Sequence, residues 1–139
     1  MTSVRDLMTP EVRCIPASET LDRAAQLMRE HHIGALPVRS SDDELTGIIT
    51  DRDIVVKCIA AGHDPSKKTA GDLAEGTPVS VDVSADADEA VRVMSDSRIR
   101  RLLVLDNGVP VGMVTEADLA RALPADQLVT FVSAVYAGR

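Results

Sequence analysis

The strongest constraint on the fold of this chain is a segment that occurs twice. Residues 47–54 read Gly-Ile-Ile-Thr-Asp-Arg-Asp-Ile, and residues 112–119 read Gly-Met-Val-Thr-Glu-Ala-Asp-Leu. Each copy opens with glycine, continues as a short apolar run that favours a strand, and ends in Thr-x-x-Asp before a helix-forming segment. The recurrence predicts two half-domains of similar structure, each with one candidate ligand site.

The sequence around these copies repeats in the same order. Val4–Met8 predicts a short helical turn and recurs as Ala70–Ala74. Apolar periodicity then predicts matching elements: a brief strand (12–15 and 79–81), an amphipathic helix (20–30 and 86–97), two strands (33–38 with 45–50, and 99–105 with 109–115) and a helix (51–61, and from 116 to before Pro124). Two copies indicate a duplication rather than a solenoid. We predict an α/β chain with one repeat over residues 1–69 and another, ending in an extra helix, over residues 70–139.

Composition limits the classes of partner. Phe131 and Tyr136 are the only aromatic residues, so the core must be aliphatic. The net charge of −7 repels nucleic acid and anionic membrane surfaces. The sequence has no apolar run of about 18 residues, which a membrane-spanning helix needs, and its first residues lack the apolar stretch of a signal peptide. We therefore expect a cytoplasmic protein that binds neither nucleic acid nor membrane.

The reactive residue types form no recognisable catalytic or metal-binding pattern. The spacing of Cys14 and Cys58 favours two free thiols, although a disulfide between subunits stays open. His31, His32 and His63 lack the spacing of a metal site, and no nucleophile motif or phosphate-binding glycine loop is present. We expect no metal and no enzymatic activity.

Two interpretations fit Thr-x-x-Asp at the start of a helix. As a capping box, the threonine side chain accepts a hydrogen bond from the third helical amide and the aspartate accepts one from the threonine amide. As a ligand site, the unpaired amides and the threonine hydroxyl bind a phosphate, and the carboxylate accepts the hydroxyl groups of a ribose. The spacing alone does not decide between them.

The order of elements, the strand Ile33–Val38 and the two Gly-x-x-Thr-x-x-Asp segments resemble a tandem pair of cystathionine-β-synthase (CBS) domains. Within this pattern, residues 28–34 and 115–118 resemble the small stand-alone CBS-pair proteins of actinobacteria of the hypoxic-response type. The resemblance implies two CBS repeats with pseudo-two-fold symmetry, each a small three-stranded sheet flanked by helices. It also implies clefts between the repeats that take an adenosyl ligand, and a homodimer.

The resemblance assigns roles to particular residues. Thr50 and Thr115 would lie near phosphate, and Asp53 and Asp118 would bind ribose. The remaining candidates divide into phosphate-binding cations and strand ends that line the base: Arg52, Arg100 and Arg101, then Ile15, Pro16, Val81 and Asp82. Each of them also has a plain structural interpretation, as a solvated helix or strand residue or a strand terminus.

The leading hypothesis is a non-enzymatic sensor of an adenosyl ligand: AMP, ADP or ATP, with S-adenosylmethionine and NAD as further candidates. It requires no cofactor. The alternative is a stress-related interaction protein in which both motifs are only helix caps. That protein would act through its dimer surface, without nucleotide, and on a protein partner that the sequence does not identify.

Overall fold

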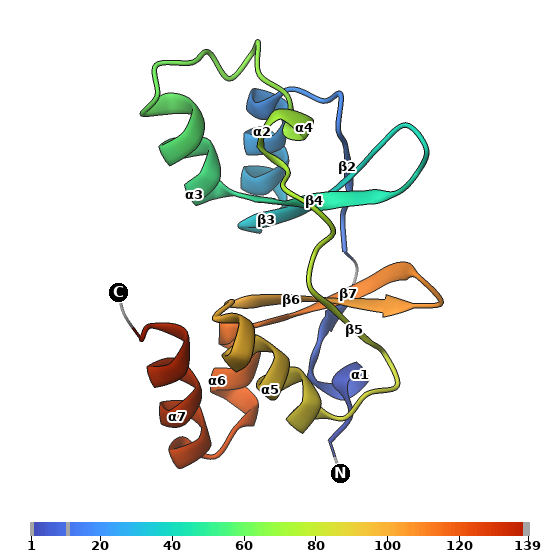
Figure 1. Ribbon diagram of the computed structural model, residues 1–139, viewed down its shortest axis with the longest axis vertical. Helices are drawn as coiled ribbons and strands as arrows, with labels where there is room; N and C mark the ends of the chain where they lie inside the picture. Colours follow the sequence, from blue (N-terminus) through green and yellow to red (C-terminus); the bar gives the residue numbers. More distant parts are fainter. Residues whose placement is uncertain (1, 11, 138–139) are drawn as a thin grey trace. The chain divides into compact units, whose positions relative to one another are not determined.

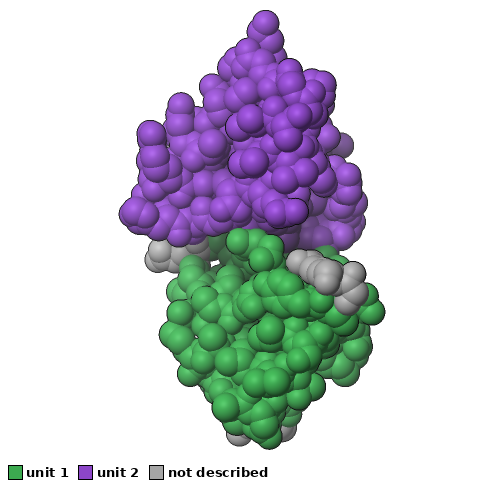
Figure 2. Space-filling view, turned by 90° about the vertical axis from the view of Figure 1, so that its left-hand side faces the viewer, with its two compact units in different colours: residues 1–12, 79–139 green, residues 13–78 purple. Residues whose placement is uncertain are grey.

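The computed structural model describes residues 2–10 and 12–137 and divides into two compact units (Figure 2). One unit comprises residues 13–78, and the other joins residues 1–12 to residues 79–139. These units do not follow the boundary expected between residues 69 and 70. The short helix that leads each sequence repeat packs in the unit formed by the rest of the other repeat. The division at residue 69 stays a prediction about sequence repeats.

The unit of residues 13–78 contains one three-stranded sheet. Strand β2 (Ile15–Pro16) runs parallel to β3 (Ala35–Arg39), which pairs antiparallel with β4 (Leu45–Thr50). Helices α2 (Leu21–His31) and α4 (Ala70–Leu73), with the helical segment after β4, lie on one face of the sheet (Figure 1). The buried core between them is aliphatic and includes Ile15, Leu21, Met28, Leu36, Val38, Ile49 and Ile54.

The helix expected at residues 51–61 changes its winding. One turn, α3 (Asp51–Asp53), continues as a π-helix, η1 (Ile54–Ile59), in which Ala60 N–H donates to the Val55 carbonyl at 2.8 Å. The wider winding is typical of short segments near functional sites. Val55, Val56 and Ile59 of this segment are exposed.

The other unit contains a sheet of four strands, not the three expected. Strand β5 (Ser80–Asp82) runs parallel to β6 (Arg101–Asp106), which pairs antiparallel with β7 (Val109–Thr115). The fourth strand, β1 (Thr9–Pro10), pairs antiparallel with the outer side of β7 (Figure 1). The brief strand expected at residues 12–15 is thus replaced by two pairs of residues, β1 and β2, one in each unit.

Four helices cover one face of this second sheet: α1 (Val4–Leu7), α5 (Ala87–Ser97), α6 (Glu116–Ala122) and α7 (Ala125–Val135) (Figure 1). The core includes Val4, Ala90, Met94, Leu102, Val104, Val114, Leu119 and Phe131. The mixed α/β class is confirmed. None of the helices in the described residues is long and apolar enough to cross a membrane.

Candidate functional site

Both copies of Thr-x-x-Asp form capping boxes. Asp53 N–H donates to Thr50 Oγ1 at 3.1 Å, and Thr50 N–H donates to Asp53 Oδ2 at 3.0 Å. The same pair of bonds joins Thr115 and Asp118, at 3.2 and 2.9 Å. A third box, Thr69 with Asp72, begins α4 outside either motif. A capping box therefore does not distinguish a ligand site in this chain. The two aspartates differ in their other contacts.

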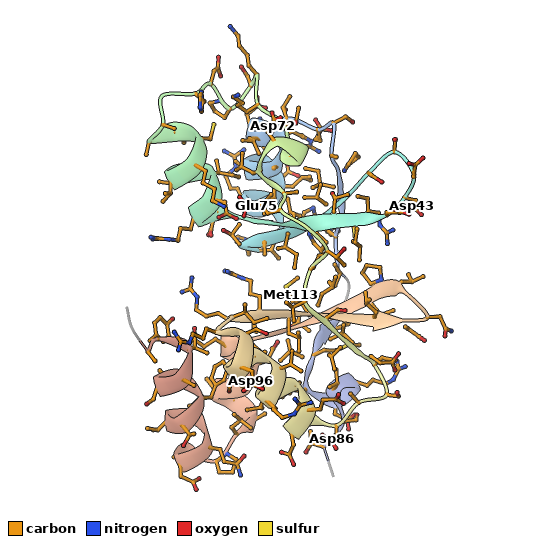
Figure 3. All side chains as sticks on the ribbon, viewed as in Figure 1. Asp43, Asp72, Glu75, Asp86, Asp96 and Met113 are labelled. Atoms are coloured by element: carbon orange, nitrogen blue, oxygen red, sulfur yellow. The ribbon has the colours of Figure 1, made fainter. Side chains whose placement is uncertain are left out.

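In the first motif, one oxygen of Asp53 lies outside the capping box. Oδ2 accepts the Thr50 amide, whereas the one partner of Oδ1 among the described residues is Lys57 Nζ, in an ion pair at 3.7 Å. The Asp53 side chain is 24% exposed. Lys57 also reaches Glu75 at 3.7 Å; Glu75 follows α4 (Figure 3). Arg52 is exposed, and its guanidinium has no hydrogen bond or ion pair with any described residue. This motif presents a partly exposed carboxylate with one oxygen outside the cap, and an exposed cation without a partner among the described residues.

In the second motif, both oxygens of Asp118 are engaged. Oδ1 accepts from Thr9 Oγ1 at 2.9 Å and from Arg121 Nη2 at 2.7 Å, while Oδ2 accepts the Thr115 amide. Asp118 is 5% exposed and is the one buried charged residue of the described chain. A buried carboxylate needs such partners, because an unpaired buried charge is strongly destabilising. The amide, hydroxyl and guanidinium donors supply these partners to the Asp118 carboxylate.

The arginines on the second sheet differ in their partners. Arg101 pairs with Thr115 across β6 and β7, and the Arg100 carbonyl accepts the Glu116 amide at 2.9 Å, so both residues lie beside the second motif. Arg100 Nη1 donates to Tyr136 Oη at 3.3 Å, and that hydroxyl donates to Glu116 Oε2 at 3.2 Å. The Arg100 guanidinium also lies 5.9 Å from the centre of the Tyr136 ring, within cation–π range.

The predicted strand ends lie apart from the motifs. Ile15 pairs with Val38, three residues along β3 from the residue that pairs with Thr50. At about 3.3 Å per residue, this is roughly 10 Å along the strand. The Ile15 side chain is buried in the core, which leaves its backbone and the exposed Pro16 for any ligand.

The second strand end repeats this arrangement. Val81 pairs with Val104, three residues along β6 from the partner of Thr115, and its side chain is buried. The exposed Asp82 carboxylate accepts hydrogen bonds from the Ser84 hydroxyl and amide at 2.6 and 2.8 Å, which lower its pKa below the ordinary value. Asp82 therefore closes a local turn.

The glycine that opens each motif has a packing role. A Cβ on Gly47 would lie 2.8 Å from Glu75 N and 2.9 Å from Ala74 Cβ. A Cβ on Gly112 would meet the Met8 side chain and lie 2.9 Å from the Thr9 carbonyl oxygen. In both units, the segment that follows the short leading helix crosses the strand at this glycine. The motif thus combines a packing glycine with a helix cap.

Sequence reasoning missed the partners of the two aspartates. Lys57 and Arg121 lie one helical turn after Asp53 and Asp118, a spacing at which side chains meet, so they could have been found. Thr9 could not, because it lies 109 residues from Asp118 in the sequence.

Neither of two surface hollows in the described chain is lined by Thr50 or Thr115. One is lined by Lys57, His63, Lys68, Asp72, Leu73 and Glu75, and the other lies between the start of α5 and residues 122–127. Cys14 and Cys58 are free thiols. The described residues contain no group of three or more His, Cys, Asp or Glu side chains that could hold a metal ion.

Comparison with known proteins identifies the family. The model of the CBS domain matches residues 4–59 and 70–125. Hypoxic response protein 1 of Mycobacterium tuberculosis is 50% identical over 135 residues, covering 97% of this chain and 94% of that protein.

Two solved structures share the fold. One is Hypoxic Response Protein I with two coordinated zinc ions, with a TM-score of 0.76 and 50% identity, covering 88% of this chain and all of that one. The other is CBSX2 in complex with AMP, with a TM-score of 0.71 and 29% identity, covering 88% and 96%. This chain belongs to the CBS domain family, as a tandem pair of CBS domains that forms a regulatory module.

Proposed function

We propose that this CBS pair is a sensor that binds an adenosyl ligand through its first Thr-x-x-Asp motif. The observation that carries the proposal is the state of Asp53, whose Oδ1 lies outside the capping box in a side chain that is 24% exposed. A ribose presents two neighbouring hydroxyl donors, and an ionised carboxylate oxygen is a strong acceptor for them. The AMP held by the related CBSX2 supports the adenosyl class.

The neighbours of Asp53 suit the rest of a nucleotide. The Thr50 hydroxyl accepts the Asp53 amide and keeps its own proton to donate to a phosphate oxygen. The exposed Arg52 guanidinium can pair with the phosphate charge. Three expectations from the sequence stay predictions. They are a cleft between the repeats, the cytoplasmic location, and contributions to binding from Ile15, Pro16, Val81, Asp82, Arg100, Arg101 and Thr115. Binding and release would change the shape or partner affinity of the module, so no reaction is required.

A thermal-shift panel of AMP, ADP, ATP, S-adenosylmethionine and NADH tests this function. A ligand at a hundredfold excess over its Kd stabilises the folded state by about 2.7 kcal/mol, so one member should raise the melting temperature by several degrees. Asp53→Asn should remove the rise. Asp72→Asn is the matched control, because it weakens a capping box at α4 and should leave the ligand-induced rise intact. No rise with any compound, and no nucleotide released on denaturation, would contradict the proposal.

A second function is favoured by one observation. Val55, Val56 and Ile59 are 55%, 47% and 55% exposed on consecutive turns of η1. Large apolar side chains that cluster on a surface mark interaction sites. We propose that this face pairs with a second copy of the chain, and that the homodimer surface serves a stress-related interaction even without nucleotide.

The dimer is tested by light scattering after size exclusion, under reducing conditions. The full chain should elute with twice its monomer mass, and Val55→Ser with Ile59→Ser should shift it towards the monomer. Val129→Ser, at the 64% exposed Val129 of α7, is the control and should leave the mass unchanged. A wild-type monomer at every concentration, or a dimer that survives the double substitution, would exclude this face.

A further inference from the structure

We infer that the second Thr-x-x-Asp motif is a structural latch, by which we mean that Asp118 holds the N-terminal segment against the sheet of its unit. Thr9 and Arg121 are the residues that keep a ribose away from Asp118. The chain would then bind one adenosyl ligand, although its sequence carries two copies of the motif. The stoichiometry rests on the proposed function; the latch does not.

The Asp118 carboxylate has little capacity left for a further hydrogen-bond donor. It accepts the Arg121 guanidinium at 2.7 Å, the Thr9 hydroxyl at 2.9 Å and the Thr115 amide at 2.9 Å, with a second contact from Thr9 at 3.2 Å. An ionised carboxylate has about four acceptor positions. A ribose would have to displace these donors from a side chain that is only 5% exposed.

The Thr9 contact reinforces the short strand β1. β1 pairs with β7 through Thr9 opposite Met113 and Pro10 opposite Gly112. This strand is only two residues long, and its backbone pairing is correspondingly weak. The bond from Thr9 to Asp118 adds a side-chain connection next to it. Asp118 therefore holds the N-terminal segment, with α1, against the sheet of its unit.

The first motif lacks counterparts of both latch residues, Thr9 and Arg121. The repeat places Glu75 where the second motif has Thr9, and Val56 where it has Arg121. An ionised glutamate cannot donate a hydrogen bond to an aspartate, and a valine cannot pair with one. Instead Lys57 lies between Asp53 and Glu75, at 3.7 Å from each, too far for a hydrogen bond. Asp53 is thus left accessible where Asp118 is enclosed.

The arginines beside the two motifs also differ in whether they have partners. Arg100, one of the two arginines beside the second motif, donates to Tyr136 and faces its ring, and Tyr136 in turn donates to Glu116. Arg52, beside the first motif, has no such partner among the described residues. Both the acceptor and a cation that a nucleotide needs are already in use at the second motif.

Calorimetric titration of the full chain with AMP tests the stoichiometry. We expect one AMP per chain, at least a tenfold loss of affinity in Asp53→Asn, and a change of less than twofold in Asp118→Asn. Thr9→Val with Arg121→Gln should expose Asp118 and raise the number bound from one towards two. Arg92→Gln, which removes an exposed arginine of α5, is the control and should leave the number at one. Two AMP per wild-type chain, or a loss of binding in Asp118→Asn alone, would overturn the inference.

A double-mutant cycle tests the latch without ligand. If Thr9 acts through Asp118, Thr9→Val should lower the unfolding midpoint of the wild type but change that of Asp118→Asn little. Fully additive losses would overturn the latch. If wild-type chain binds no AMP at all, that result counts against an AMP sensor, and the cycle still decides the role of Thr9.

Discussion

Phe131→Ala is expected to lower the free energy of unfolding of its unit by about 3–5 kcal/mol, the range for large-to-small changes at a buried aromatic residue. Phe131 is 1% exposed and is the largest of the fully buried side chains. It comes from α7 and packs in the core of the four-stranded unit. The other fully buried side chains of this core are aliphatic, and they cannot collapse completely into the space that its removal leaves.

Urea denaturation followed by far-ultraviolet circular dichroism measures this loss. Val129→Ala provides the control on the same helix, because Val129 is exposed and its truncation should change stability by no more than about 0.5 kcal/mol. A loss below about 1 kcal/mol for Phe131→Ala would mean that α7 does not pack as described.

Gly47→Val is expected to lower the free energy of unfolding of the other unit by about 3 kcal/mol, the upper end of the cost of overpacking. Its Cβ would lie 2.8 Å from Glu75 N, a backbone atom that cannot rotate away, and within 3.0 Å of Ala74. The φ of +155° adds strain for any side chain. The substitution should push α4 and the segment after it away from β4.

Gly62→Ala separates the two causes. Gly62 has φ of +82°, but a methyl group added there would meet nothing within 4 Å, so only backbone strain of about 1–2 kcal/mol is expected. Chemical denaturation of both variants gives the comparison. Equal losses for Gly47→Val and Gly62→Ala would show that the segment after α4 does not approach the strand closely enough to require glycine.

Much of this arrangement could be predicted from the sequence, because its signals are local. The change from an apolar run to Thr-x-x-Asp marks the junctions where β4 meets Asp51 and β7 meets Glu116, and both helices begin there. The threonine and aspartate side chains cap them as the motif implies. Helix periodicity likewise placed α2 and α5 within one residue of their bounds.

The differences between the motifs could not be predicted, because they depend on distant residues. Asp53 and Asp118 occupy the same position of the same motif, yet one is accessible and the other is enclosed by Thr9 and Arg121. A two-residue strand such as β1 has no periodicity to detect, and its pairing with β7 is fixed only in the folded chain. The packing of α1 and α4, each in the unit formed by the rest of the other repeat, could not be predicted for the same reason.

The unequal motifs give the duplication a physical explanation. Under the two proposals above, one copy keeps the chemistry that an adenosyl ligand needs, while the other copy uses the same aspartate to secure the N-terminal segment. A helix cap tolerates both uses, since the capping box engages only one carboxylate oxygen in each copy. The two copies differ in the surroundings of the other carboxylate oxygen, Oδ1 of Asp53 and Oδ1 of Asp118.

The most direct measurement is mass spectrometry of the small molecules released when the purified full chain is denatured, compared between wild type and Asp53→Asn. An adenosyl compound should be released from the wild type and be depleted from Asp53→Asn, while Asp72→Asn should release as much as the wild type. No adenosyl compound from the wild type even after incubation with the nucleotide panel, or equal amounts from Asp53→Asn, would contradict the assignment of the first motif as the ligand site.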